Sequence, residues 1–410
     1  MSKSIKILSY LSADSFIFDF KSAKKRVDEA INPTHLFYSE IFSDLSKNNV
    51  YIKPENLQKT GSFKLRGAYN KISKMDEESK SVGIVTASAG NHAQGVAFSA
   101  NHQGIKAIVC MPETTPMIKV DGTLKYGAEV DLHGQTFDET NTYAQELAKE
   151  KGYTFIPPYD DEDVIEGQGT IALEILESLQ EADYILVPIG GGGLVSGIAK
   201  CAKEMKPEIK IVGVEPANAA SMQAAMENGG PITLDSADTI ADGTAVARVG
   251  DITYEICKEN VDEYISVTEE EIMVALTTLM EKHKLVAEPS GALSLAASKK
   301  LGCKNKNVVC VISGGNIDMS FISQLIHKGL YEDGRIARFT VELQNAPGKL
   351  RDLLDVIAYT KANIVEVLHD SLAATSRYKN IQVEITLETN GKDHIRKIKE
   401  LLTEKGYNIH

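Results

Sequence analysis

The sequence predicts an α/β protein built on parallel β-sheets, followed by a small C-terminal domain with a different pattern. Over most of the 410 residues, short apolar runs rich in β-branched residues alternate with amphipathic helical segments. Strands that are apolar throughout are typical of a parallel sheet covered by helices on both faces. The strands expected on this basis are residues 83–87, 107–111, 184–189, 211–214 and 308–312. The expected helices are residues 64–72, 93–101, 139–151, 167–178, 194–205 and 269–284.

The pattern changes after a break near residues 329–334. Beyond it the expected elements are a strand, a helix, two strands, a helix and a short strand, at residues 338–343, 347–360, 363–369, 381–387, 392–402 and 407–409. The order β-α-β-β-α-β is typical of a ferredoxin-like module. We therefore expect residues 335–410 to form a separate domain.

Composition excludes several classes of function. The net charge of −13, with no long basic stripe, argues against nucleic acid and against an anionic membrane as partners. The five cysteines are scattered and form no Cys-x-x-Cys pair, so neither a disulfide framework nor a zinc site is expected. Residues 1–18 lack the apolar core of a signal peptide, and no apolar run approaches the ~18 residues of a membrane span. A cytoplasmic protein is predicted.

Ligands of parallel sheets bind in the loops at the carboxyl ends of the strands, so the glycine-rich loops are the candidate ligand-binding segments. Lys64 lies between Gly61 and Gly67 at the start of an expected helix. One interpretation is a solvated lysine on a helix capped by Ser62. The other is an amine that forms a Schiff base with an aldehyde cofactor.

A second loop, Ser88-Ala89-Gly90-Asn91, follows an expected strand and precedes an expected helix. Its small residues leave backbone N–H groups open at a helix N-terminus, which suits a carboxylate. Asn91 could donate a hydrogen bond to a phenolate-type oxygen. The alternative is a tight turn in which Asn91 caps the helix and His92 is only packed.

A third loop contains four successive glycines, Gly190, Gly191, Gly192 and Gly193, followed by Leu194. Four bare amides at a helix start can wrap a phosphate, whereas a structural turn rarely needs more than two glycines. The spacing fits neither a dinucleotide fingerprint nor a P-loop. A fourth loop, residues 313–316, begins with Ser313, whose neutral hydroxyl could face a ring nitrogen.

Together these loops supply an amine, a phosphate cradle, an oxygen partner and a ring-nitrogen partner, which match pyridoxal 5′-phosphate. The motifs at residues 61–67, 88–92, 190–193, 288–291 and 313–316 resemble those of the threonine dehydratase (threonine ammonia-lyase) family, in the same order. The resemblance covers about residues 15–325. It implies a tryptophan synthase β-like (fold type II) catalytic region at residues 1–330, with a smaller inserted subdomain at about residues 80–160.

The resemblance also implies roles for individual residues. Lys64 would carry the cofactor and then act as the general base on the substrate, and Phe63 would pack beside the cofactor. Asn91 would bind the cofactor's 3′-oxygen, and Ser313 would face the pyridine nitrogen. The phosphate would be held by Gly190, Gly191, Gly192, Gly193 and Leu194, and the substrate carboxylate by Ser88, Ala89, Gly90 and Asn91.

The reaction implied is that of a carbon–nitrogen lyase, which converts L-threonine into 2-oxobutanoate and ammonia. L-serine should yield pyruvate, because one methyl group is worth only about 1–3 kcal/mol of discrimination. A catabolic serine/threonine dehydratase or a serine racemase is the alternative, but the racemase pattern has a serine where this chain has Ala89. A non-enzymatic amino-acid sensor is a further alternative, disfavoured by the intact set of motifs.

Two acidic features were interpreted without assigning a site. Some relatives bind a divalent cation at positions that correspond to Glu215, Ala219 and Ser221, where the last residue should be an aspartate. No tightly bound divalent metal is therefore expected, and a weakly held or monovalent ion is the alternative. The acidic run at residues 159–163 is expected to be a solvated loop rather than a cation site.

The C-terminal segment resembles the ACT domains, on residues 344–350 and on Asn363-Ile364. Such domains pair side by side and bind small amino acids, so the resemblance implies allosteric regulation by isoleucine or valine, a homotetramer and the committed step of isoleucine biosynthesis. A module that only drives oligomerisation is the alternative. The expected effector-binding residues are Asn345, Gly348, Lys349, Leu350, Asn363 and Ile364.

Overall fold

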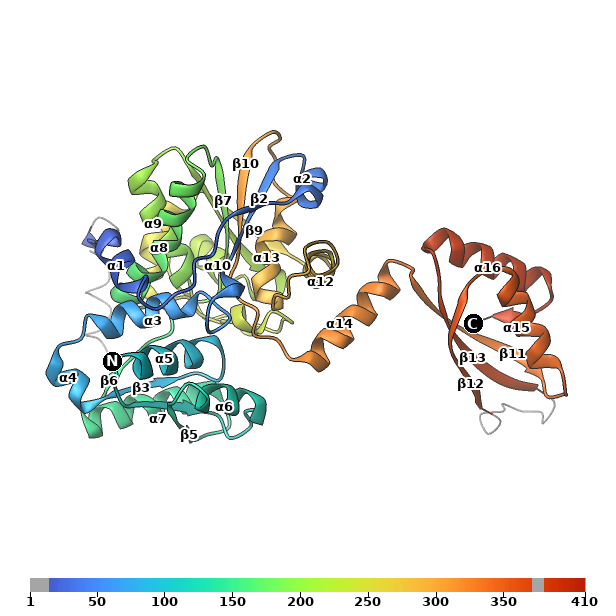
Figure 1. Cartoon of the computed structure of the whole chain (residues 1–410), viewed down its shortest axis with the longest axis horizontal. Helices are drawn as coiled ribbons and strands as arrows, with labels where there is room; N and C mark the ends of the chain where they lie inside the picture. Colours follow the sequence, from blue (N-terminus) through green and yellow to red (C-terminus); the bar gives the residue numbers. More distant parts are fainter. Residues whose placement is uncertain (1–14, 371–379, 410) are drawn as a thin grey trace. The chain divides into compact units, whose positions relative to one another are not determined.

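The computed structural model describes residues 15–370 and 380–409, which form two compact units, Met1–Ile317 and Asp318–His410 (Figure 1). Residues 1–14, 371–379 and 410 lie outside the described part. The expectation that residues 1–18 are not a signal peptide therefore falls mostly outside it. No helix of the described residues is long and apolar enough to cross a membrane.

Among the described residues, six strands form the larger sheet of the first unit, in the order β1-β2-β10-β7-β8-β9. All neighbours pair in parallel except β1, which is antiparallel to β2. The strands are β1 (Phe37–Tyr38), β2 (Asn49–Pro54), β7 (Tyr184–Pro188), β8 (Lys210–Pro216), β9 (Glu263–Val267) and β10 (Asn307–Ile312).

Helices cover both faces of this sheet. Alternate residues of β7 and β10, such as Ile185 and Val309, pack in one core with α8 (Glu162–Ser178) and α9 (Gly193–Met205). Helix α13 (Pro289–Ser298) packs against β10 and β7, on the other side of the sheet in Figure 1. Burial of both faces explains why these strands are apolar throughout, as the sequence predicted.

The smaller sheet of the first unit has four parallel strands among the described residues, in the order β5-β4-β3-β6. Successive side chains along its strands point to opposite faces, so the apolar residues form two cores, one on each face of the sheet. Val109 and its face pack against α5, whereas Ile108 and its face pack against α7. The elements are β3 (Ile84–Ala87), α5 (Asn91–His102), β4 (Ala107–Met111), α6 (Met117–Leu124), β5 (Glu129–Leu132), α7 (Phe137–Lys151) and β6 (Thr154–Phe155).

The remaining elements of the first unit connect and flank the two sheets. They are α1 (Phe20–Val27), α2 (Glu40–Ser46), η3 (Glu55–Leu57), α3 (Lys64–Ser73), α4 (Glu77–Val82), η4 (Ala217–Ala219), α10 (Ser221–Asn228), η5 (Asp242–Thr244), α11 (Asp251–Asn260), α12 (Glu269–Thr278) and η6 (Leu279–His283). The helix expected at residues 269–284 is therefore interrupted: α12 ends at Thr278 and a π-helical turn follows. The turn carries His283, whose Nε2 lies 2.7 Å from Ser39 Oγ.

The second unit is an antiparallel sheet of four described strands, in the order β12-β13-β11-β14, with two helices packed on it. After α14 (Met319–Glu332) the order is β11 (Ile336–Gln344), α15 (Lys349–Tyr359), β12 (Asn363–Asp370), β13 (Asn380–Glu388), α16 (Lys392–Glu404) and β14 (Asn408–Ile409). This is the β-α-β-β-α-β order that the sequence predicted. The unit begins at Asp318, before the expected break at residues 329–334, because α14 belongs to it.

Candidate active site

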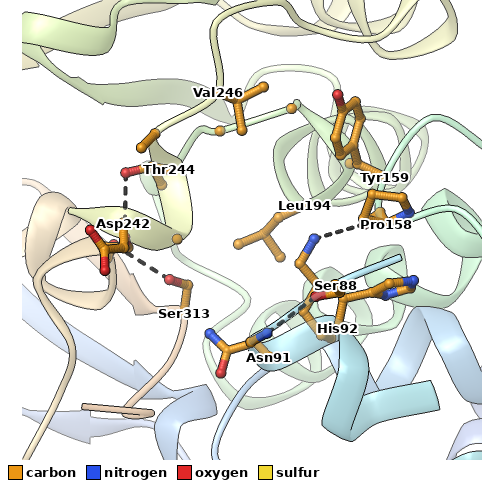
Figure 2. A pocket seen from close by; sticks show the side chains of 18 of the residues that line it. Ser88, Asn91, His92, Pro158, Tyr159, Leu194, Asp242, Thr244, Val246 and Ser313 are labelled. Atoms are coloured by element: carbon orange, nitrogen blue, oxygen red, sulfur yellow. Dashed lines mark hydrogen bonds between the residues drawn. The ribbon is translucent and has the colours of Figure 1, made fainter. Parts of the chain in front are cut away.

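A cavity of about 730 Å³ lies in the first unit, where loops from the two parallel sheets meet (Figure 2). Its walls come from the start of α3 and from the loops that follow β3, β7 and β10. The cavity is lined by all the predicted cofactor and substrate residues: Phe63, Lys64, Ser88, Ala89, Gly90, Asn91, Gly190, Gly191, Gly192, Gly193, Leu194 and Ser313. Because parallel strands share one direction, their C-terminal loops meet at one edge, and this places the four motifs around one space.

Lys64 is the first residue of α3, and its amine points into the cavity rather than into solvent. Nζ donates a hydrogen bond to the Pro158 carbonyl oxygen at 2.7 Å and lies 5.4 Å from the centre of the Phe63 ring. Burial lowers the pKa of Lys64 to about 8, although the Glu288 carboxylate opposes this change. A partly neutral amine is a competent nucleophile near neutral pH.

The alternative of a solvated lysine on a helix capped by Ser62 is wrong. The N-cap residue of α3 is Phe63, and the Ser62 hydroxyl is buried without a hydrogen-bond partner among the described residues. The Ser62 backbone instead forms a bridge with Gly314, and Phe63 N–H donates to the Ser313 carbonyl at 3.0 Å. The lysine loop is thereby tied to the loop that carries Ser313.

Asn91 does not cap its helix either, because the N-cap position of α5 is Gly90. Asn91 Nδ2 donates to Glu288 Oε1 at 2.7 Å, and Asn91 Oδ1 is buried with no partner in the described part of the chain. His92 is packed, as one interpretation expected: its Nε2 lies 3.0 Å from the Ile156 carbonyl oxygen. Burial lowers the pKa of His92 to about 3, so this ring is neutral and donates to that carbonyl.

The glycine loop leaves no room for side chains. A Cβ atom on Gly191 would lie 2.4 Å from the Tyr159 ring, and one on Gly193 would lie 2.9 Å from Tyr159 Cβ. Gly192 is the N-cap of α9 with φ of +100°, a conformation that favours glycine. The loop therefore presents bare backbone at the positive end of a helix, which is an arrangement suited to a phosphate.

Ser313 directly follows β10, and its hydroxyl lies on the cavity wall (Figure 2). Ser313 Oγ donates a long hydrogen bond of 3.4 Å to the Ser290 carbonyl oxygen. A hydroxyl bound this weakly is available to a ligand, as donor or acceptor.

Several lining residues carried no usable signal in the sequence. Pro158 binds Lys64 through its carbonyl oxygen, and Tyr159 and Thr244 line the cavity from segments that no motif marks. Glu288 belongs to a recognised motif, but only the fold reveals its partner, Asn91. Burial, with a smaller contribution from Asp242, raises the pKa of Glu288 to about 7.

The acidic run at residues 159–163 is not a solvated loop, and that interpretation is wrong. Asp160 accepts hydrogen bonds from three backbone N–H groups at the start of α11. Asp161 caps α8 and pairs with Lys71 at 2.7 Å. Asp163 pairs with Lys71 on α3 and with Lys74 just after it. These carboxylates bind the N-termini of helices and the side chains of lysines. The contacts hold in place the segment that carries Pro158 and Tyr159.

Glu215 is bound by backbone groups. Its two carboxylate oxygens accept from Met222 N–H at 2.7 Å and from Gln223 N–H at 2.9 Å, and burial raises its pKa to about 7. The nearby Ser221 hydroxyl is buried and has no partner within residues 15–370 and 380–409. The described chain holds no group of three His, Cys, Asp or Glu side chains arranged for a metal ion.

The predicted effector residues of the second unit do not lie together in one chain. Asn345, Gly348, Lys349 and Leu350 follow the C-terminal end of β11. Asn363 and Ile364 begin β12, and Asn363 aligns through Glu388 with Ile336, the first residue of β11. The two segments therefore lie at opposite ends of the sheet.

The cavity fits pyridoxal phosphate in its chemistry. A buried amine of lowered pKa, a glycine-lined helix N-terminus and the second N–H of the Asn91 carboxamide correspond to the aldehyde, the phosphate and the ring oxygen of that molecule. The residues that would hold it come from four separated segments of the first unit.

Comparisons with known proteins agree. Residues 27–314 match the family model described as pyridoxal-phosphate dependent enzyme. The chain is 43% identical over 392 residues to the L-threonine ammonia-lyase of Thermotoga maritima, covering 95% of this chain and 98% of that protein.

Two solved structures have similar folds. One is the processed form of threonine deaminase isoform 2 from Solanum lycopersicum, with a TM-score of 0.73 and 40% identity over 75% of this chain and 92% of that chain. The other is maize serine racemase, with a TM-score of 0.72 and 34% identity over 78% of this chain and 98% of that chain. The chain belongs to the family of pyridoxal-phosphate dependent enzymes.

Proposed function

We propose that this protein is a threonine ammonia-lyase, which converts L-threonine into 2-oxobutanoate and ammonia and also accepts L-serine. The observation that carries the proposal is the convergence of Lys64, Asn91, the glycine loop and Ser313 on one cavity. The likeness to the Thermotoga L-threonine ammonia-lyase extends over nearly the whole of both chains and supports this substrate.

Lys64 performs the covalent and proton-transfer steps in this proposal. Its lowered pKa provides a neutral amine that can bind the cofactor's aldehyde carbon. As a neutral amine, Lys64 would also act as the general base that takes the proton from the substrate α-carbon. Bound pyridoxal phosphate supplies the electron-withdrawing ring that stabilises the negative charge left on that carbon.

The other residues bind and orient. Residues 190–194 would hold the phosphate group at the N-terminus of α9, Phe63 would pack beside the ring, and Asn91 would bind its 3′-oxygen. Ser313 would meet the ring nitrogen through a hydroxyl, which does not retain a proton there as a carboxylate does. A less electron-withdrawing ring favours loss of the β-hydroxyl over transamination.

The substrate carboxylate would rest on residues 88–91, where bare amides lie at the start of α5. Ala89 offers no hydroxyl that could return a proton to the opposite face of the substrate. This residue favours the lyase over the racemase, although the fold is shared with maize serine racemase.

The second unit would be an ACT domain that reports branched-chain amino acids, with isoleucine or valine as the effector. Because residues 345–350 and 363–364 lie at opposite ends of its sheet, a ligand that touches both segments must lie between two copies. This arrangement supports an oligomer, which we propose is a homotetramer, and a regulated biosynthetic role. The free cysteines favour the cytoplasm.

The test is oxoacid release from L-threonine by the purified protein loaded with pyridoxal phosphate, with and without isoleucine. Lys64→Ala is the matched variant, and D-serine formation from L-serine measures racemisation. The proposal requires 2-oxobutanoate from the wild type, none from the variant and little D-serine. Bound cofactor without turnover of threonine or serine would instead indicate a sensor.

A further inference from the structure

Glu288 connects the two walls of the cavity. It precedes α13, which packs on the larger sheet, whereas its partner Asn91 begins α5, which packs on the smaller one. The Glu288 backbone N–H donates to the Gly314 carbonyl at 3.1 Å, next to Ser313. A Cβ atom on residue 314 would lie 2.2 Å from Glu288 Oε1, so glycine there leaves the space that the carboxyl group occupies.

The hydrogen bond between the two side chains selects one orientation of the Asn91 amide. An ionised carboxylate only accepts hydrogen bonds, so it favours Nδ2 at 2.7 Å and disfavours the reversed amide, whose oxygen would face it. One N–H of Asn91 is then used by Glu288, and the second remains as a donor for an oxygen of the cofactor. The buried Asn91 Oδ1, unpartnered within the described ranges, is the other end of the same amide.

We propose that Glu288 is a positioning residue that fixes the Asn91 carboxamide so that its free N–H faces the oxygen of the bound cofactor. The inference rests on the assignment of the cavity to pyridoxal phosphate. It adds Glu288 to the residues that have a role in the proposed function. Its action passes through Asn91, since Asn91 is the side chain with which Glu288 shares a hydrogen bond among the described residues.

The ionisation of Glu288 controls this orientation. Asp242 faces the carboxyl group as a like charge, and Lys119 and Lys64 face it as opposite charges. Burial outweighs the lysines and raises the pKa of Glu288 to about 7. Above this pH the carboxylate holds Nδ2; below it the carboxyl group becomes an O–H donor, and the reversed amide is no longer penalised.

The experiment is a pH titration of the absorption band of the lysine-bound cofactor, in wild type and in Glu288→Gln. The glutamine keeps an oxygen that accepts from Asn91 but does not ionise. We expect a spectral step near neutral pH in the wild type that is absent in Glu288→Gln. Asp242→Asn is the matched control: it removes a like charge from the same cavity, so the step should persist at lower pH.

A double-mutant cycle on the cofactor dissociation constant tests the route of the effect. Glu288→Ala should weaken cofactor binding about tenfold in the wild type and less than about twofold in an Asn91→Ala background. Equal weakening in both backgrounds, or a spectral step that survives in Glu288→Gln, would overturn the inference alone. A wild-type protein that binds no pyridoxal phosphate would overturn both the inference and the proposed function.

Discussion

The two units of this chain arrange their predicted functional residues in opposite ways. In the first unit, loops from Lys64 to Ser313 surround one cavity, although they are far apart in the sequence. In the second, Gly348 and Asn363 are close in sequence but lie at opposite ends of one sheet. In the first unit the residues lie in loops that follow the C-terminal ends of strands. In the second unit β11 and β12 run in the same direction, since both are antiparallel to β13, and Gly348 follows the end of β11 whereas Asn363 begins β12. The first set of residues is therefore brought together within one chain, whereas the proposed effector site of the second unit would require another copy.

The largest effect should come from removing the amine at the centre of the first site. Lys64→Ala deletes both the group that carries the cofactor and the general base, so kcat for L-threonine should fall by at least about 10³-fold. Oxoacid release measures this loss. Lys80→Ala, a lysine of α4 that pairs with Glu77 and does not line the cavity, is the control and should retain activity. Wild-type turnover by Lys64→Ala would contradict the role of Lys64 at the centre of the first site.

The capture of the cofactor should depend steeply on pH. The neutral amine is the reactive form, and burial lowers the pKa of Lys64 from its usual 10.5 to about 8. The capture rate of pyridoxal phosphate by cofactor-free protein should rise about tenfold per pH unit between pH 6 and 8 and then level off. Stopped-flow absorbance measures it. A rate that continues to rise to pH 10 would show an exposed lysine instead.

Crowding the glycine loop should weaken the first site without reaching the second unit. In Gly191→Ala the new Cβ meets the Tyr159 ring, which should cost about 1–3 kcal/mol of folding free energy and about tenfold in cofactor affinity. Thermal unfolding and cofactor titration measure the two quantities. Gly302→Ala is the control, because a Cβ there meets no described atom within 4 Å. Equal thermal stability and equal cofactor affinity in the two variants would contradict the predicted clash between residue 191 and the Tyr159 ring.

Mixed oligomers test whether the second site lies between copies. Asn345→Ala and Asn363→Ala should each weaken the response to isoleucine by several-fold, since each removes one side of the site. Co-assembled protomers of the two variants should regain part of the response, because some pairs then combine two intact sides. No recovery on mixing would place the whole site within one chain and remove the contrast between the units.

The smallest expected effect concerns the substrate loop. Ala89→Ser places a hydroxyl beside Gly90 on the loop proposed to bind the substrate carboxylate. We expect D-serine formation from L-serine to rise from a trace to a few per cent of turnover, measured by chiral chromatography, with threonine turnover reduced less than about threefold. Unchanged racemisation would show that other residues separate the lyase from the racemase.

The sequence predicted most of the first unit because its signals were local. Apolar strands such as β4 and β10, and glycine-rich loops after strands, are visible in short windows. The contacts between loops are not visible in such windows, because they join residues that are far apart in the sequence. Pro158 acts through a backbone carbonyl, which any residue provides. Asp160 resembles a solvated acid in the sequence, because the N–H groups of α11 that bind it lie about 90 residues further along the chain.

In the second unit the elements were predictable, but their grouping was not. The strand and helix order follows from hydrophobic periodicity, and the observed bounds of β12 and β13 lie close to the expected ones. The distance between Gly348 and Asn363 depends on strand direction, which a motif comparison does not include. The π-helical turn at residues 279–283 was likewise invisible to a search for 3.6-residue periodicity.

The most direct test of the central claim, that the four loops of the first unit form one cofactor site around Lys64, is to identify the lysine that carries the cofactor. Borohydride reduction of the loaded protein, followed by peptide mass mapping, fixes the cofactor to its lysine. We expect the label on Lys64, in the segment between Gly61 and Gly67. A label on Lys119, which lines the same cavity from α6, would contradict it.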